Sequence, residues 1–298
     1  MQLNLFWRQN YPKSPNSQLW HIVCYSGGHS SFLVAVEVAR KYGTENLILL
    51  NHDIREDRED PDIKRFKRQG SEYLRIPIVY ANRGRPLHDN GHFVTSEAPP
   101  IEDQFDVCIR SQAFKPAQGT ELCTSRLTTE PFRAWLDFFF PNKNCIVYYG
   151  FDSVETRRIQ RRSSIMGEMG YRTDYPLAFW PRTIYSSTEL GIAPPAVYGV
   201  FKHANCIGCL KAGKQHWYVV FCTRPEVWEK AKDAETEIGH SILKESYLED
   251  LEPDFIRMQK AGIPASEQIP SGQFWKMVRQ SKCQVIEDVD LKPCECFI

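Results

Sequence analysis

The residues best suited to chemistry lie near the start of the chain, in the run Ser26-Gly-Gly-His-Ser-Ser31. Two adjacent glycines let the backbone turn sharply and approach a ligand closely. If a helix begins in this run, its first N–H groups have no partner within the helix and favour an anion such as phosphate. Serine hydroxyls and the imidazole add donors. We therefore expect a phosphate-binding loop formed by Ser26, Gly27, Gly28, His29, Ser30 and Ser31.

The spacing of this loop is not that of a Walker A motif, which has four residues between its glycines and a following lysine. The residues from His21 to Tyr25 are typical of a buried strand, and those from Ser31 to Tyr42 of a helix. The alternative interpretation of the run is an ordinary glycine-rich turn between a strand and a helix.

Cysteines form the second group of candidate residues. Cys206-Ile-Gly-Cys209 places two thiols around a glycine-containing turn, so that both sulfurs can face one metal ion or cluster. Such a pair is half of a site, and Cys123 is the best candidate for its partner. Cys222, Cys108 or His216 could complete the set, and a histidine ligand would favour zinc. The alternatives are a redox dithiol for the pair and a buried apolar thiol for Cys123.

Charged residues form the third group. Arg157, Arg158, Arg161 and Arg162 occupy two pairs of helical positions four residues apart, and could bind phosphates or form a solvated face. Glu155 could accept hydrogen bonds from these arginines or from a ribose. Asp53 follows an apolar run and could bind Mg²⁺ or ribose, or be an exposed turn residue.

Composition limits the classes of protein. The chain has 298 residues with 37 basic and 37 acidic side chains, so it is no polycation for unspecific nucleic-acid binding. No apolar stretch approaches the roughly 18 residues of a membrane span, and the N-terminus has no apolar secretory segment. Ten cysteines in such a chain favour reduced thiols or metal ligands. We expect a cytoplasmic protein without a membrane partner.

Strand-like and helix-like runs alternate, which predicts an α/β protein with a mainly parallel, doubly wound sheet. Expected strands cover 21–25, 46–51, 75–80 and 145–149, and expected helices cover 31–42, 60–73, 129–140 and 154–169. Residues 82–120 are expected to form a long loop with short helical pieces, and 181–210 an irregular segment. Helices are expected again at 225–238, 243–261 and 272–282. We divide the chain into a nucleotide-binding domain, 1–200, and a mostly helical region carrying the CxxC knuckle, 201–298.

In parallel sheets, ligands bind beyond the carboxyl ends of the strands. The loop residues Ser26–Ser31, the pair Asn51 and Asp53, and the turn at Gly150 and Phe151 all follow expected strands. We therefore expect these segments to meet at one edge of the sheet.

The loop resembles the SGGxxS loop of the PP-loop superfamily, the adenine nucleotide α-hydrolases with a HUP-like fold. Three further segments are similar to motifs of its phosphoadenosine phosphosulfate (PAPS) reductase-like family. Cys123 to Pro131 resembles its Cys-x-x-x-Leu-Lys-x-x-Pro, Tyr149 to Glu155 its Gly-Ile-Arg-x-x-Glu, and Tyr175 to Leu177 its Pro-Leu. Cys206 and Cys209 occupy the place of the second cysteine pair of cluster-binding members. These matches cover residues 20 to about 220 in the family's order.

The resemblance implies an enzyme that binds ATP with Mg²⁺, cleaves it between the α- and β-phosphates and adenylates a substrate for sulfur transfer. It implies nucleotide contacts from the loop and from Asn51, Gly150, Phe151 and Glu155. Catalytic roles would fall to Cys123, Arg158 and Asp53. A 4Fe-4S cluster, or alternatively Zn²⁺, would be held by Cys123, Cys206, Cys209 and Cys222.

The chain also departs from the family pattern. Leu122-Cys123 stands where cluster-binding reductases have two cysteines, and the catalytic ECGxH-type tail is absent, although Cys294 and Cys296 lie near the end. Thr128 replaces the motif lysine and Ser30 the usual loop aspartate. Reduction of a sulfonucleotide and a nucleotide- and zinc-binding regulatory role therefore remain alternatives. The acceptor could be a tRNA, DNA, a small metabolite or a protein, and the enzyme could be a homodimer.

Overall fold

The computed structural model describes residues 18–52, 59–82, 102–114, 122–203, 206–244 and 246–281. Its centre is a five-stranded sheet with the strand order β3-β2-β1-β4-β5. The strands are β1 (Trp20–Cys24), β2 (Leu47–Asn51), β3 (Ile78–Tyr80), β4 (Cys145–Tyr148) and β5 (Arg172–Asp174). Every neighbouring pair is parallel. The predicted α/β architecture with a parallel sheet is confirmed.

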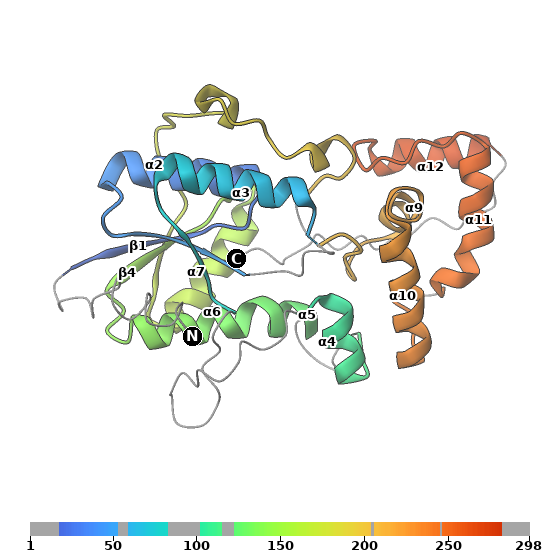
Figure 1. Ribbon diagram of the computed structural model, residues 1–298, viewed down its shortest axis with the longest axis horizontal. Coiled ribbons are helices and arrows are strands. Elements are labelled where there is room, and N and C mark those ends of the chain that lie inside the picture. Colours follow the sequence, from blue (N-terminus) through green and yellow to red (C-terminus); the bar gives the residue numbers. More distant parts are fainter. Residues whose placement is uncertain are drawn as a thin grey trace.

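Helices cover both faces of this sheet (Figure 1). Alternate residues of the central strand β1 face opposite sides, because successive side chains of a strand point in opposite directions. Ile22 and Cys24 pack in one apolar core with the helices α6 (Glu130–Phe139) and α7 (Thr156–Glu168). Val23 and Tyr25 pack in a second core with α2 (His29–Tyr42) and α3 (Pro61–Leu74). Both faces are buried, so the strands read as continuous apolar runs.

The strand order places a topological switch point between β1 and β4. From β1 the chain crosses to β2 and β3 on one side, whereas β4 and β5 extend the sheet on the other side. The helices that follow β1 and β4, α2 and α7, therefore pack on opposite faces of the sheet. Parallel sheets bind ligands at the carboxyl edge beside such a switch point.

The helix before β4 begins earlier than the sequence predicts. A short helix α5 (Leu122–Thr124) continues into a π-helical turn η1 (Ser125–Thr129) and then into α6. The N–H of Glu130 bonds to the Ser125 carbonyl in this wider turn. Pro131 has no N–H to donate, and the wider turn accommodates it inside the helical stretch. The helix expected at 129–140 is present as α6, whereas the helical turns that precede it from Leu122 onward were not expected.

The C-terminal helices pack around a third apolar core beside the sheet (Figure 1). They are α9 (Lys214–Thr223), α10 (Pro225–Ile238), α11 (Leu248–Lys260) and α12 (Ser271–Gln280). Trp217, Trp228 and Phe255 are buried at its centre. The helix α4 (Gln104–Ser111), from the region expected to be a loop, contributes Phe105 and Cys108.

Residues 181–203, here called the connecting segment, lead from the sheet to this third core. They follow the short helix α8 (Pro176–Phe179) and contain two 3₁₀ turns, η2 (Ser187–Leu190) and η3 (Ala196–Gly199). Figure 1 shows this segment crossing over α2 and α3. In the described part of the chain, no helix is both long enough and apolar enough to span a membrane.

Candidate functional site

The loop after β1 starts α2 without a side-chain cap. Gly28 is the N-cap residue in extended conformation, and Gly27 adopts the left-handed φ of 86° that glycine tolerates. The Ser31 hydroxyl donates to the Gly28 carbonyl at 2.8 Å and accepts from the Ser26 hydroxyl at 3.4 Å. Among the described residues the N–H groups of Ser30 and Ser31 have no hydrogen-bond acceptor. The loop thus presents free amides at a helix N-terminus, the arrangement that binds phosphate.

The close packing behind the loop leaves no room for a side chain at Gly27. A Cβ on this residue would lie 2.8 Å from Ile63 Cγ2 and 2.8 Å from Lys67 Cγ. Lys67 is buried, and its ammonium pairs with the buried Glu59 carboxylate at 2.5 Å. Gly27 therefore lies on the side of the loop that packs against α3.

The turn after β4 approaches the same loop from the other side. A Cβ on Gly150 would lie 3.1 Å from the backbone nitrogen of Ser31 and 3.1 Å from the carbonyl carbon of Ser30. Glycine at this position is what allows the two turns to come together. The turn after β4 and the loop after β1 are thus adjacent in space, as the sequence predicts.

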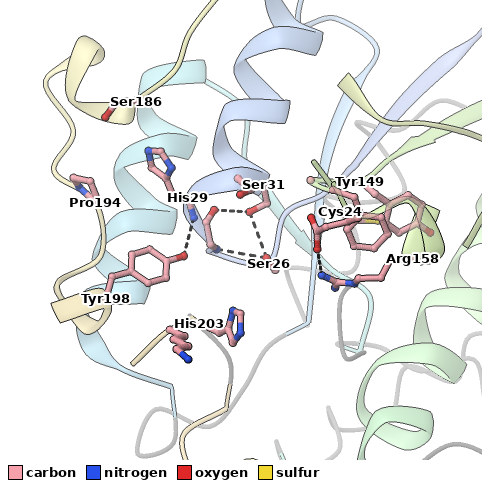
Figure 2. Close-up of a pocket in the computed structure, with 16 residues that line it drawn as sticks. Cys24, Ser26, His29, Ser31, Tyr149, Arg158, Ser186, Pro194, Tyr198 and His203 are labelled. Atoms are coloured by element: carbon pink, nitrogen blue, oxygen red, sulfur yellow. Dashed lines mark hydrogen bonds and ion pairs between the residues drawn. The ribbon is translucent and has the colours of Figure 1, made fainter. Parts of the chain in front are cut away.

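A cavity of about 500 Å³ opens between these two turns, a size typical of sites for small ligands. The turn after β1 contributes Cys24, Ser26, Gly28, His29, Ser30 and Ser31. The turn after β4 and the start of α7 contribute Tyr149, Gly150, Phe151, Glu155 and Arg158. The connecting segment contributes Ser186, Pro194, Tyr198, Lys202 and His203. Figure 2 shows Tyr198 and His203 on one side of the cavity, with Tyr149 and Arg158 on the other.

Arg158 and Glu155 form an ion pair at the start of α7. The Glu155 carboxylate also accepts from the Asp152 N–H at 2.9 Å, and the Arg158 guanidinium lies 4.4 Å from the centre of the Phe151 ring. These contacts fix the guanidinium at the cavity. Arg162 faces the Tyr149 ring, whereas Arg157 and Arg161 are exposed, so the four arginines divide into an inner and an outer pair.

His29 holds the connecting segment against the loop. Its Nε2 accepts from the Ser187 N–H at 3.1 Å, which places the ring proton on Nδ1. Burial, followed by the nearby Arg182, lowers the pKa of His29, so the ring is neutral near pH 7. The ring is therefore a hydrogen-bond acceptor for the connecting segment.

Asn51 ends β2 outside the residues that line the cavity. Its side-chain oxygen accepts from the His52 N–H at 2.6 Å, and its buried Nδ2 has no partner among the described residues. Asp53, the expected Mg²⁺ or ribose ligand, lies outside the described residues, as do Cys294 and Cys296.

The cysteines predicted as metal ligands differ in burial. Cys123 is buried and belongs to the third core, and Cys206 and Cys209 are half-buried. Cys222 lies in α9 and hydrogen-bonds Tyr218, and burial raises its pKa. Over the residues that the structure describes, no group of three His, Cys, Asp or Glu side chains is placed to hold a metal ion. The predicted CxxC knuckle is thus not seen as a ligand set, and convergence of these cysteines stays a prediction.

His216 contacts the turn between Cys206 and Cys209. Its Nε2 accepts from the N–H groups of Gly208 and Cys209, at 3.2 and 3.3 Å, and its Nδ1 lies 2.6 Å from the Glu267 carboxylate. Both ring nitrogens are therefore engaged, and the ring supports the turn between Cys206 and Cys209. Gln104 holds the same turn by donating to the Ile207 carbonyl at 2.8 Å.

Sequence reasoning missed the third side of the cavity. Tyr198, Lys202 and His203 come from an irregular proline-rich stretch without periodicity, so no local pattern indicated their place. Cys24 was missed as well, although it ends the strand before the loop; burial raises the pKa of its thiol to about 12 and keeps it protonated. Tyr149 directly precedes Gly150, and its position at the end of the predicted strand could have indicated it.

No protein-family model matches this chain, and neither a curated protein nor a solved structure gives a match to it.

Proposed function

We propose that this protein is a PP-loop ATP pyrophosphatase of the PAPS reductase-like family that adenylates an acceptor. The observation that carries the proposal is the meeting of the loop after β1 and the turn after β4 around one cavity, where the strand order reverses. Ser26, Gly28, His29, Ser30, Ser31, Gly150, Phe151, Glu155 and Arg158, all expected from the sequence, line that cavity.

The free amides of Ser30 and Ser31 support phosphate binding, because they combine with the positive end of the α2 dipole. The apolar base of a nucleotide can pack on the opposite side of the cavity, where the rings of Tyr149 and Phe151 stack with centroids 5.7 Å apart. Together the two sides suit a ligand with one charged and one aromatic end. An adenine nucleotide has this character.

In the proposed reaction an acceptor oxygen attacks the α-phosphorus of ATP. The bond from that phosphorus to the oxygen bridging the α- and β-phosphates breaks, and pyrophosphate leaves with the electron pair. The loop amides stabilise the charge that develops on the departing pyrophosphate, which is an electrostatic contribution. Arg158, fixed beside Phe151, lies in place to stabilise the α-phosphate charge. Mg²⁺ would neutralise part of the phosphate charge.

The family resemblance extends the proposal to sulfur transfer, in which a sulfur nucleophile displaces AMP from the adenylated acceptor. A 4Fe-4S cluster would supply a sulfide, and Cys123, Cys206 and Cys209 are the expected ligands. Among the described residues, no group of three His, Cys, Asp or Glu side chains is placed to hold a metal ion. The acceptor could be a tRNA, DNA, a small metabolite or a protein.

Pyrophosphate release from ATP tests the reaction. Gly150→Ala adds a Cβ only 3.1 Å from the loop backbone and should slow release about tenfold by displacing the loop. Gly199→Ala is the matched control, because a Cβ there meets nothing within 4 Å. Release of sulfite from a sulfonucleotide, without pyrophosphate from ATP, would favour a reductase instead. Tight nucleotide binding without turnover would favour the regulatory role.

A further inference from the structure

The connecting segment is attached along its length to α2 and α3. Glu37 accepts from the N–H groups of Thr183 and Ile184, at 2.6 and 3.1 Å, and Asp62 accepts from the Ala196 N–H at 2.5 Å. On either side of Tyr198, Val197 and Phe201 are buried in the third core. Tyr198 therefore occupies a fixed position.

The Tyr198 hydroxyl lies at the phosphate-binding loop (Figure 2). Its oxygen accepts from the His29 N–H at 3.1 Å, and a Cβ on Gly28 would lie 3.3 Å from it. The described residues provide no acceptor for the hydroxyl proton. Accepting one hydrogen bond strengthens a hydroxyl as a donor in the next. Burial raises the pKa of Tyr198, so the proton is present at neutral pH.

Lys202 brings positive charge to the same side of the cavity. Its backbone is held by the Glu267 carboxylate, which accepts from the Lys202 N–H at 3.0 Å. Its ammonium forms no ion pair with any described residue, whereas Arg158 across the cavity is paired with Glu155. Burial lowers the pKa of His203, the neighbour of Lys202, and Lys202 and Tyr198 line the same cavity.

We propose that Tyr198 and Lys202 bind the terminal pyrophosphate part of a nucleoside triphosphate and thereby select it over a monophosphate. This inference rests on the proposed function and assigns two further residues to its site. The Tyr198 hydroxyl extends the row of donors formed by the Ser30 and Ser31 amides, and Lys202 neutralises the phosphates that these donors hold. A nucleoside monophosphate lacks the groups that reach this row.

Calorimetric titrations of Tyr198→Phe and Lys202→Met with ATP, AMP and inorganic tripolyphosphate test the inference. Each variant loses a hydrogen bond or an ion pair to a charged ligand. Its affinity for ATP and for tripolyphosphate should therefore fall about tenfold, and its affinity for AMP less than about twofold. The matched controls are Tyr185→Phe, an exposed tyrosine of the same segment, and Lys260→Met, an exposed lysine of α11. Both controls should bind all three ligands as the unmodified protein does.

Unchanged affinity of both variants for ATP and tripolyphosphate would overturn the inference, and so would an equal loss for AMP. The lysine is exposed, so Lys202→Met keeps the test valid if Tyr198→Phe should unfold. If the protein binds tripolyphosphate through these two residues but binds no ATP, the anion site stands and the proposed function fails. If it binds none of the three ligands, both fail.

Discussion

The backbone N–H of His29 donates to the hydroxyl of Tyr198 at 3.1 Å, although 169 positions separate the two residues in the sequence. This contact joins the first turn of α2 to the segment that leads into the C-terminal helices. The His29 ring makes a second contact, because its Nε2 accepts from the Ser187 N–H. The backbone and the side chain of His29 thus both attach the loop after β1 to the connecting segment.

Replacing Gly27 by alanine should disturb both the fold and the loop. An alanine in the left-handed region lowers the free energy of unfolding by about 1–2 kcal/mol. Its Cβ would also overlap Ile63 and Lys67, which lowers that free energy by a further ~1–3 kcal/mol. Gly262→Ala is the control, since φ there is 73° but a Cβ meets nothing within 4 Å. Urea unfolding should show the larger loss for Gly27→Ala, and only that variant should lose ATP affinity. Equal losses in the two variants would contradict the packing seen behind the loop.

Arg158 and Arg157 are adjacent in sequence but differ in position. Arg158 lines the cavity over the Phe151 ring, whereas Arg157 is exposed. Arg158→Ala should reduce kcat/KM for pyrophosphate release about tenfold or more, because it removes a positioned charge at the phosphates. Arg157→Ala should change it less than about twofold. If the two variants lose activity to the same extent, a general charge effect explains the loss and the assigned role is wrong.

The stability of the fold should fall in acid through His52. Burial lowers the pKa of this imidazole from 6.5 to about 3. A backbone hydrogen bond with Thr128 opposes this shift, and the nearby positive charge of Lys67 adds to it. Above the unfolded pKa both states are neutral, so the contribution is fully present. As the pH falls below 6.5, the unfolded chain takes up a proton that the folded chain does not, and stability is lost down to about pH 3.

His52→Asn removes this titrating group and tests the effect. Between about pH 7 and about pH 5, the free energy of unfolding of the unmodified protein should drop by ~2 kcal/mol more than that of the variant, at about 1.4 kcal/mol per pKa unit. Urea unfolding at the two pH values measures the difference. His21 and His29 also have lowered pKa values and remain in both proteins, so they cancel in the comparison. Parallel loss in both proteins would show that His52 is not the sensitive group.

The parts of the fold that repeat a local pattern could be predicted from the sequence. The strands β1, β2 and β4 are continuous apolar runs, and α10 lies within the expected bounds of 225–238. The strand β5 (Arg172–Asp174) is short and polar, so only its pairing with β4 identifies it as a strand. The helix α9 is buried nearly all round and lacks an amphipathic pattern, which explains why it was missed.

The candidate site likewise contains residues that could be predicted from the sequence and residues that could not. Ser26 to Ser31 and Gly150 follow strands, so sheet topology alone brings them to one edge. Tyr198 and Lys202 reach the cavity through the hydrogen bonds of Glu37, Asp62 and His29 with an irregular segment. Such long-range contacts leave no periodic pattern in the sequence.

The cysteine assignment predicts that the purified protein binds a metal. We expect iron in protein purified without oxygen, and loss of that iron in Cys206→Ala, because Cys206 would be a ligand. Cys145→Ala is the control, since this thiol is buried in β4 within the sheet. Iron and zinc analysis distinguishes a cluster from a zinc site. Metal content that is the same in Cys206→Ala and in the unmodified protein would exclude the predicted ligand set.

The central claim is that nucleotide phosphates bind the free amides of the loop after β1. Amide chemical shifts of ¹⁵N-labelled protein, titrated with ATP and separately with adenosine, test it most directly. We predict that the Ser30 and Ser31 amide signals move on addition of ATP and stay in place with adenosine, because only ATP carries the phosphates. If saturating ATP leaves both signals unmoved, or if adenosine moves them equally, the phosphate-binding role of this loop is wrong.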